Sequence, residues 1–406
     1  MRVHHELLSR EQLPFLALWL VLLSIPLAIA LTKFAAVIFL LAFVWAGYIR
    51  NLRSHVFLLS VGLISLINIY DLFHYHLFAD HLGPVRHIWY LWFLPLVAAM
   101  PWSRQRFVDL LRAFILALTV NGLIGVAQVL GWHFRNLLGQ GPIGLAQTHI
   151  TFSMMLASGL LLLLFAIKDK KLFWSPSVAV FIFLLLLWQL MFTIGRTGQA
   201  VFFILALLVL LWMFPRYRIA GALSVFVVAG IALLSPVLRS RWVQAVFDVY
   251  LFFNGWVITS VGLRLVYAHS ALQMFAEHPF FGVGAGQFRA AYYDLAQRGL
   301  EPKLPPVVDS MIGPNNSFLA YLSELGLFGF VPLIVLMGYL WIRAWRQSEP
   351  LLRYVQVVTW LWFVLGSFAD TFIWLEGQAI PFAILMAVHY VSSEEETPVT
   401  ACEGVH

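Results

Sequence analysis

Two arginines are the side chains of this sequence whose type and position most clearly suggest chemistry. Arg196 lies in TIGRTGQA, at the border of an apolar run, and Arg264 opens an amphipathic segment. A guanidinium group is permanently charged, and its planar fork of N–H donors fits phosphate oxygens. Together the two arginines would suit a diphosphate. Separately, each has a simpler interpretation, Arg196 as a membrane-interface side chain that reaches towards water and Arg264 as a surface charge.

Asn315 and Asn316 begin the stretch NNSFLAYLSELGLFG, an apolar run that contains one acid, Glu324. Amides that follow Pro314 can simply cap a helix, which is their more common role. They can also position a substrate. On a regular helix Asn315 and Glu324 project from opposite faces, so they cannot share one site. Glu324 is therefore interpreted either as a supporting group or as a structural acid paired with a neighbouring helix.

Other polar motifs have weaker functional interpretations. The sequence GVGAG at 282–286 follows a predicted helix and not a strand, so a turn is favoured over a phosphate-binding loop. A histidine spacing of i, i+2 suits a helical metal site poorly, and we predict no metal at His74, His76, His81 and His87. Three more polar residues are expected at the outer ends of membrane helices, namely His149, Asp370 and Glu376.

Composition places the chain in a bilayer. Hydrophobic residues make up 62% and charged residues 11%, with a mean hydropathy of +0.87, whereas globular proteins have roughly 25% charged residues. Apolar runs of about 17 to 25 residues recur along the chain, which predicts α-helical spans and not a β-barrel. The lone Cys402 excludes a disulfide within one chain and a cysteine metal site.

The breaks between apolar runs predict an all-α integral membrane protein with twelve transmembrane helices. The predicted spans are 13–32, 34–48, 55–70, 87–100, 107–130, 148–167, 173–194, 198–214, 219–237, 316–342, 354–370 and 377–391. Alternate connections are basic, including YIRNLRSH, PWSRQR, KDKK and PRYR. The positive-inside rule therefore predicts that both termini are cytoplasmic. The net charge of +6 then needs no nucleic acid to explain it.

One connection is too long to be a tight turn. We predict that residues 1–406 form a single membrane domain, in which 238–315 is a partly helical periplasmic loop and 392–406 a cytoplasmic tail. The loop contains two helical patterns, LRLVYAHSALQMFAEHP and GQFRAAYYDLAQRG, the second ending at Gly299. In the first pattern, the residues at helical spacing are Leu265, Ala268, Leu272 and Phe275. Such a loop would cap a site on the outer membrane surface.

These motifs together resemble the O-antigen ligase and polymerase superfamily. FTIGRTGQA, GLRLVYAHSALQMFAEHPFFGVGAGQF and NNSFLAYLSELGLFG stand in the family's order and spacing, over about residues 190–330. Members are inverting glycosyltransferases of the bacterial inner membrane, which take a glycan from an undecaprenyl pyrophosphate carrier on the periplasmic face. The resemblance implies that Arg196 and Arg264 hold the pyrophosphate and that Asn316 matches the asparagine of a histidine-asparagine pair.

Asn315 stands where that pair has its histidine. The family histidine is taken to activate or orient the acceptor hydroxyl, but an amide cannot accept a proton near neutral pH. Asp309 and His278 are possible supporting groups, and Glu324 is a poorer one. Three explanations stay open: another group is the base, the reaction depends on proximity and a good leaving group, or the chain is an inactive or altered member.

The resemblance favours an O-antigen ligase that needs no metal and no cofactor. Its expected partners are an undecaprenyl-pyrophosphate-linked glycan as donor, lipid A-core as acceptor, and membrane lipids. An O-antigen polymerase or a protein O-glycosyltransferase is the alternative, and the ligase is preferred because one outer loop dominates. A multi-span transporter is the competing class. It would need mid-span charges, broken helices and internal repeats, and the first nine predicted spans show neither mid-span charges nor a repeat.

Overall fold

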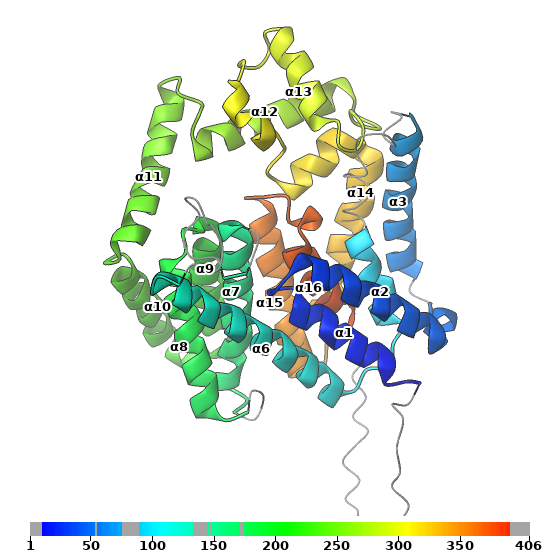
Figure 1. Cartoon of the computed structure of the whole chain (residues 1–406), viewed down its shortest axis with the longest axis vertical. Coiled ribbons are helices and arrows are strands. Elements are labelled where there is room, and N and C mark those ends of the chain that lie inside the picture. The colour runs from blue at the N-terminus through cyan, green and yellow to red at the C-terminus, as the bar shows by residue number, and fades with distance from the viewer. Residues whose placement is uncertain are drawn as a thin grey trace, which may run out of the picture.

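The computed structural model describes residues 10–52, 55–74, 89–132, 144–145, 148–170, 172 and 174–389. Within these ranges every regular element is a helix, in agreement with the predicted all-α class (Figure 1). The predicted tail, 392–406, lies outside the described residues.

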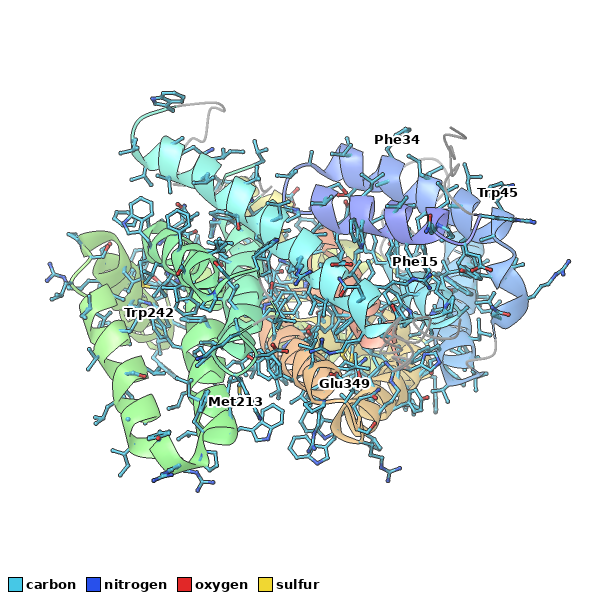
Figure 2. All side chains as sticks on the ribbon, turned by 90° about the horizontal axis from the view of Figure 1, so that it is seen from below. Phe15, Phe34, Trp45, Met213, Trp242 and Glu349 are labelled. Carbon is cyan, nitrogen blue, oxygen red and sulfur yellow. The ribbon has the colours of Figure 1, made fainter. Side chains whose placement is uncertain are left out.

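Five helices of the described chain are long and apolar enough to cross a membrane. They are α6 (Arg104–Val129), α7 (His149–Leu164, extended by a 3-10 turn to Ile167), α9 (Arg196–Met213), α10 (Arg218–Ala232, preceded by a turn from Pro215) and α14 (Ser317–Trp345). The chain is thus a multi-pass membrane protein. Large apolar side chains such as Phe34 and Trp45 lie on its outer surface, 65% and 52% exposed, as lipid-facing residues do (Figure 2).

The other predicted spans coincide with shorter or less apolar helices, so the number twelve stays a prediction. These helices are α1 (Leu13–Ser24), α2 (Ile29–Trp45), α3 (His55–His74), α5 (Phe93–Ala98), α8 (Pro176–Phe192), α15 (Pro350–Ser367) and α16 (Glu376–Ala387). The helix α1 ends before Pro26, which cannot donate a backbone hydrogen bond. Its 12 residues rise about 18 Å, less than the roughly 30 Å of a hydrocarbon core.

Helices α7 and α16 lie at the centre of the bundle. Nearly all of α16 is buried, and α7 packs against α8, α9, α15 and α16. Contact between α7 and α9 is close because α9 has glycines there: a Cβ atom at Gly195 or Gly198 would overlap Ser153. Small residues commonly permit such packing in membranes. These glycines therefore bring helix α7 close to α9 and fix where α9 begins, at Arg196.

The segment 238–315 is a helical cap with its own hydrophobic cluster. It consists of α11 (Pro236–Phe253), α12 (Ser260–Glu277), α13 (Phe288–Gln297) and a 3-10 turn (Pro306–Met311). In Figure 1 α11 rises from α10 along one side of the bundle, and α12 and α13 lie over the end of the bundle. The buried cluster joins all three later elements, with Tyr267 from α12, Tyr292 from α13 and Val308 from the turn. The sequence predicted α12 and α13 but not α11.

The helix α12 follows the predicted spacing, and its buried face carries other residues than the apolar ones noted in the sequence. Leu265 and Leu272 are exposed, 41% and 52%, whereas Tyr267, Ala271 and Met274 are buried. The helix packs against α11, α13 and α14, and these contacts turn Leu265 and Leu272 outwards. The helix period was predicted correctly, but in a lipid-exposed protein apolar side chains occur on both faces. The prediction for the end of α13 is confirmed: Gly299 has φ 73°, and Leu300 N donates to Leu295 O over 3.0 Å.

The cap is joined to a break in α14. Gly326, with φ 59° and ψ −158°, interrupts this helix and leaves backbone groups without intrahelical partners. Residues 279–284 supply those partners. Val283 N and Gly284 N donate to the carbonyls of residues 323 and 324 over 2.9 Å each, and residues 327 and 328 donate to those of 279 and 280 over 2.8 and 3.1 Å. GVGAG is thus a turn that docks on a helix. A broken helix was expected of a transporter, but here the break attaches the cap.

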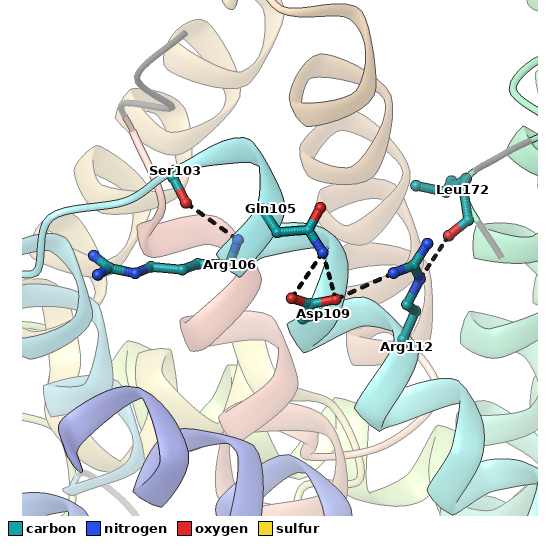
Figure 3. A network of polar contacts seen from close by, with 6 residues as sticks. All are labelled: Ser103, Gln105, Arg106, Asp109, Arg112 and Leu172. Atoms are coloured by element: carbon teal, nitrogen blue, oxygen red, sulfur yellow. Dashed lines mark hydrogen bonds and ion pairs between the residues drawn. The ribbon is translucent and has the colours of Figure 1, made fainter. Parts of the chain in front are cut away.

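The opposite end of the molecule holds a network of ion pairs. In Figure 3 Ser103 caps α6, and Asp109 accepts from Gln105 over 2.8 Å and from Arg112 over 3.2 Å. Arg104 lies 2.9 Å from Asp169 and 3.6 Å from Glu349. These residues come from three segments that the charge pattern assigns to one side of the membrane. The structure brings them together on one face, and the cytoplasmic identity of that face stays a prediction.

Candidate functional site

The two predicted arginines meet at one hydroxyl group. Arg196 is the first residue of α9, and its Nη2 donates to Ser260 Oγ over 3.1 Å. Arg264 lies one turn after Ser260 on α12, and its Nη1 donates to the same Oγ over 2.6 Å and to the Ser260 carbonyl over 2.7 Å. Both arginines are half-buried. Two permanent positive charges therefore converge on a single neutral oxygen, where the cap meets the bundle.

A third arginine, Arg241 of α11, lies beside the pair. Its backbone carbonyl accepts from Arg196 Nη1 over 3.2 Å, and its own Nη1 donates to Gln244 Oε1 over 2.9 Å. All three arginines are close enough to His149, the first residue of α7, to interact with it electrostatically. Within the described residues, Arg241 Nε and His149 Nδ1 are both buried without a hydrogen-bond partner. The cluster thus has free hydrogen-bonding capacity as well as positive charge.

Two carboxylates lie near the arginines without forming an ion pair with them. Asp248 of α11 is buried and attracts Arg196, and Asp370, in the connection after α15, attracts Arg264. Neither carboxylate lies within 4.0 Å of an arginine in the described part of the chain. Burial raises the pKa of Asp370, although hydrogen bonds from Thr371 and the charge of Arg264 act in the opposite direction.

The connection after α15 links the arginine pair to the start of α14. The carbonyl of Ala369 accepts from Arg264 Nε over 3.3 Å, and the carbonyl of Phe368 accepts from Asn316 Nδ2 over 3.3 Å. Ser317 Oγ donates to the carbonyl of Asp370, also over 3.3 Å. Three segments far apart in the sequence are thereby held together: the start of α12, the start of α14, and residues 368–370.

Asn316 is the N-cap of α14. Its Oδ1 accepts from the backbone N–H groups of Phe318 and Leu319 over 2.9 and 3.1 Å, so its amide oxygen is used by the helix end and its nitrogen by Phe368. Asn315 precedes it with φ 44°, in the left-handed region that asparagine and histidine tolerate better than most residues. Its Nδ2 donates to the Gly313 carbonyl over 3.1 Å. The backbone at this position would therefore accept the family's histidine.

The three supporting candidates lie away from the arginine pair or are bound to other groups. Glu324 is buried, and its Oε2 accepts from Gly286 N over 2.9 Å, which is a contact of the docked cap segment. Asp309 pairs weakly with Arg289, Oδ2 to Nη1 3.9 Å. His278 is exposed just past the last residue of α12, about 20 Å along the helix from Arg264. No contact in the described chain connects these three to Ser260.

No metal-binding group is found within the described residues. Among them, no three or more His, Cys, Asp or Glu side chains are arranged to hold a metal ion. Of the histidines considered for metal, His76, His81 and His87 lie outside the described residues, as does the side chain of His74. Glu376 lies 3.4 Å from Lys33 in an ion pair.

The sequence analysis missed several residues of this cluster. Ser260, Arg241 and Asp248 belong to α11 or the start of α12, and α11 was not predicted. A signal was present for Ser260, because a serine four residues before Arg264 lies on the same face of a helix. Asp370 was noted only as a residue at a helix end. Its link to Arg264 depends on a contact between positions 105 residues apart, which no local pattern indicates.

Comparison with protein families supports the resemblance. Residues 180–334 match a family described as O-antigen ligase. This segment belongs to the O-antigen ligase superfamily. No curated protein matched the chain. The O-antigen ligase segment runs from α8 into α14 and contains the arginine cluster, the cap and both asparagines, while residues 368–370 lie beyond it. Membership implies a membrane glycosyltransferase-like activity on lipid-linked glycans.

Proposed function

We propose that the protein is an inverting glycosyltransferase that moves a glycan from an undecaprenyl-pyrophosphate carrier to lipid A-core at the periplasmic face, that is, an O-antigen ligase. The observation that carries the proposal is the convergence of Arg196 and Arg264 on Ser260 Oγ, at 3.1 and 2.6 Å. A neutral hydroxyl is a weaker acceptor for these arginines than an anion, because opposite charges add an electrostatic attraction to the hydrogen bond. A diphosphate that entered here would replace the hydroxyl as acceptor for both arginines.

The arginines would then stabilise the leaving group. As the acceptor hydroxyl attacks the anomeric carbon from the side opposite the carrier, the bond from that carbon to the pyrophosphate oxygen breaks and negative charge develops on the diphosphate. Donors fixed in advance around this charge lower the barrier without reorganising during the reaction. Arg241 adds a third positive charge beside them. The cap over this cluster would exclude water and favour transfer over hydrolysis.

In this proposal Asn315 orients the acceptor hydroxyl and Asp370 takes its proton. An amide can hold the hydroxyl by hydrogen bonds but cannot act as a base. Asp370 is the carboxylate whose loop joins both Arg264 and the start of α14, and its pKa is raised by burial, which makes it a better proton acceptor than an ordinary aspartate. Asn316 and Glu324 hold the helix and the cap in place, and Asp309 and His278 belong to the cap.

The ligase is preferred to the polymerase and to the protein O-glycosyltransferase because one cap with a single buried cluster covers the site. A lipid acceptor, like the lipid donor, cannot leave the bilayer and must reach the site along the membrane surface. The exposed Leu265 and Leu272 of α12 present an apolar surface suited to that approach.

The test is transfer by the purified protein in lipid nanodiscs, with an undecaprenyl-pyrophosphate glycan as donor and lipid A-core as acceptor. Arg264→Ala is expected to lower the initial rate about 100-fold, the effect of removing one transition-state donor, and Arg264→Lys to lower it less. Arg298→Ala is the matched control, because Arg298 lies in the same cap but pairs with Glu277 at 2.8 Å. A rate unchanged by Arg264→Ala would reject the diphosphate site. Transfer to other acceptors but not to lipid A-core would reject the ligase assignment.

A further inference from the structure

A cavity of about 570 Å³ lies at the end of α14 opposite to the arginine pair. Its walls combine the aromatic rings of Phe57 and Tyr339 with the basic side chains Arg343, Arg346 and His389. Arg343 lies near the last residue of α14, 27 positions after the N-cap Asn316 and beyond the break at Gly326. The cavity therefore lies at the other end of the helix bundle from the arginine pair.

Arg343 has most of its hydrogen-bonding capacity unused. Its Nη1 donates over a long 3.4 Å to the Ala387 carbonyl, and its guanidinium carbon lies 5.1 Å from the centre of the Phe57 ring. Its Nε and Nη2 are buried and have no acceptor among the described residues. The described lining of the cavity contains no carboxylate. An unpaired guanidinium in such surroundings is costly, and an anion is the ligand that would remove this cost.

We propose that this cavity binds the phosphate group of an anionic membrane phospholipid. Basic pockets between membrane helices on the positively charged side of a membrane protein suit lipid headgroups, and the guanidinium fork fits two phosphate oxygens. The volume is within the range of about 300 to 1,000 Å³ typical of ligand sites. The acyl chains have an adjacent surface, because Leu59 of α3 and Ile342 of α14 are 64% and 50% exposed and these two helices pack together.

Two other sources of negative charge must be separated from a lipid. Free inorganic phosphate has the same chemistry without acyl chains. The chain itself supplies the other source, because the acidic sequence EEE at 394–396 follows His389 by only a few residues. A lipid accounts for both halves of the site, the basic cavity and the exposed apolar surface beside it.

The experiment is native mass spectrometry of the delipidated full chain in detergent, titrated with phosphatidylglycerol or with phosphatidylcholine of the same acyl chains. We expect the protein to bind phosphatidylglycerol more tightly, and Arg343→Gln to weaken that binding about fivefold, which corresponds to roughly 1 kcal/mol for one arginine near anionic lipid. Arg218→Gln, at an exposed arginine on the start of α10, is the control and should not change it. Arg343→Lys, which keeps the charge, should retain most of the binding if the fold is intact.

Equal affinity for the two lipids, or unchanged binding in Arg343→Gln, would overturn the proposal. Displacement of phosphatidylglycerol by millimolar inorganic phosphate would overturn the lipid assignment, and failure of phosphate to compete supports it. In the full chain, replacement of Glu394, Glu395 and Glu396 by Gln should leave lipid binding unchanged. A severalfold rise would show instead that the acidic segment occupies the cavity.

Discussion

Two groups of arginines, Arg196 with Arg264 at the cap and Arg104 with Arg112 at the other end, differ in the groups that they bind. At the cap, Arg196 and Arg264 donate to a serine hydroxyl and to backbone carbonyls. At the other end, Arg104 pairs with Asp169 and Glu349. Figure 3 shows the nearby pair of Arg112 with Asp109. A carboxylate neutralises the arginine that it binds, whereas a neutral acceptor leaves the charge available. Residue type alone therefore does not separate a structural arginine from one available to a ligand.

The largest effect is expected when a carboxylate is placed where Arg196 and Arg264 meet. Ser260→Asp is expected to convert them into paired arginines and to lower glycan transfer about 100-fold, because the carboxylate would compete with the diphosphate for the same donors. Ser260→Ala removes only the neutral acceptor and should keep the rate within about threefold. Initial rates in nanodiscs measure both. Full activity of Ser260→Asp would show that the substrate does not use this point.

The next effect concerns the carboxylate that lies near the cap arginines without pairing. Asp370→Asn is expected to reduce transfer about 100-fold, which is the lower end of the contribution of a general base. Because burial raises the pKa of Asp370, the rate should fall on the acidic side at a higher pH than the value of about 4 for a free aspartate, and this decrease should disappear in Asp370→Asn. The pH profile of kcat/KM checks it. An unchanged profile would exclude Asp370 as the base.

The same raised pKa affects stability with a defined sign. The folded protein holds the Asp370 proton more tightly than the unfolded chain does, so this residue contributes stability below the pKa of the unfolded chain. That contribution is lost as the pH rises through the folded pKa. Thermal unfolding of the native chain and of Asp370→Asn across this range should therefore converge at low pH and separate at high pH.

A smaller effect, an increase in the rate of transfer, is expected at Asn315, where the sequence departs from its family. Asn315→His would add a group that can accept a proton next to Asn316, at the start of α14, and φ 44° is a conformation that histidine tolerates. We expect transfer to rise about tenfold, less than the full effect of a general base, because Asp370 already provides this function in our proposal. No gain in initial rate, with the protein folded, would indicate that this side chain does not face the acceptor.

The smallest effect is expected at the paired arginines. Arg104→Ala removes two exposed ion pairs, and surface pairs contribute about 0 to 1 kcal/mol. The free energy of unfolding should fall by no more than this, and glycan transfer should not change. A large loss of transfer in Arg104→Ala would contradict the distinction between arginines paired with carboxylates and the cap arginines Arg196 and Arg264.

Much of the fold follows from local patterns in the sequence. Apolar runs predicted the helices of the bundle, and the pattern after Gly262 predicted α12 and α13, including the glycine at the end of α13. Local patterns failed where several faces of a helix are apolar. The buried face of α12 does not follow from its apolar spacing because, in a lipid environment, Leu265 can be exposed while Tyr267 is buried. The helix α11 was read as part of a connection because its 18 residues include arginines and an aspartate.

The site was predictable only in its residue types. Arg196 and Arg264 were identified individually, each with a simpler interpretation as an interface or surface charge. No local pattern indicates that Ser260 Oγ accepts hydrogen bonds from both of them. Glu324 shows the reverse case: its position in an apolar run suggested chemistry or pairing with a neighbouring helix, and the structure shows it accepting from a backbone N–H group of the cap. Such contacts depend on the break at Gly326, which requires a positive φ that the sequence allows but does not demand.

The attachment of residues 279–284 to α14 limits how substrates can arrive. Lifting the cap would break backbone hydrogen bonds that replace those of an interrupted helix, each worth about 0.5 to 1.5 kcal/mol, and would leave their partners unsatisfied. The cap and the outer part of α14 must therefore move as one piece. In our proposal the lipid-linked donor would therefore enter sideways from the lipid phase, below a cap that stays attached to α14.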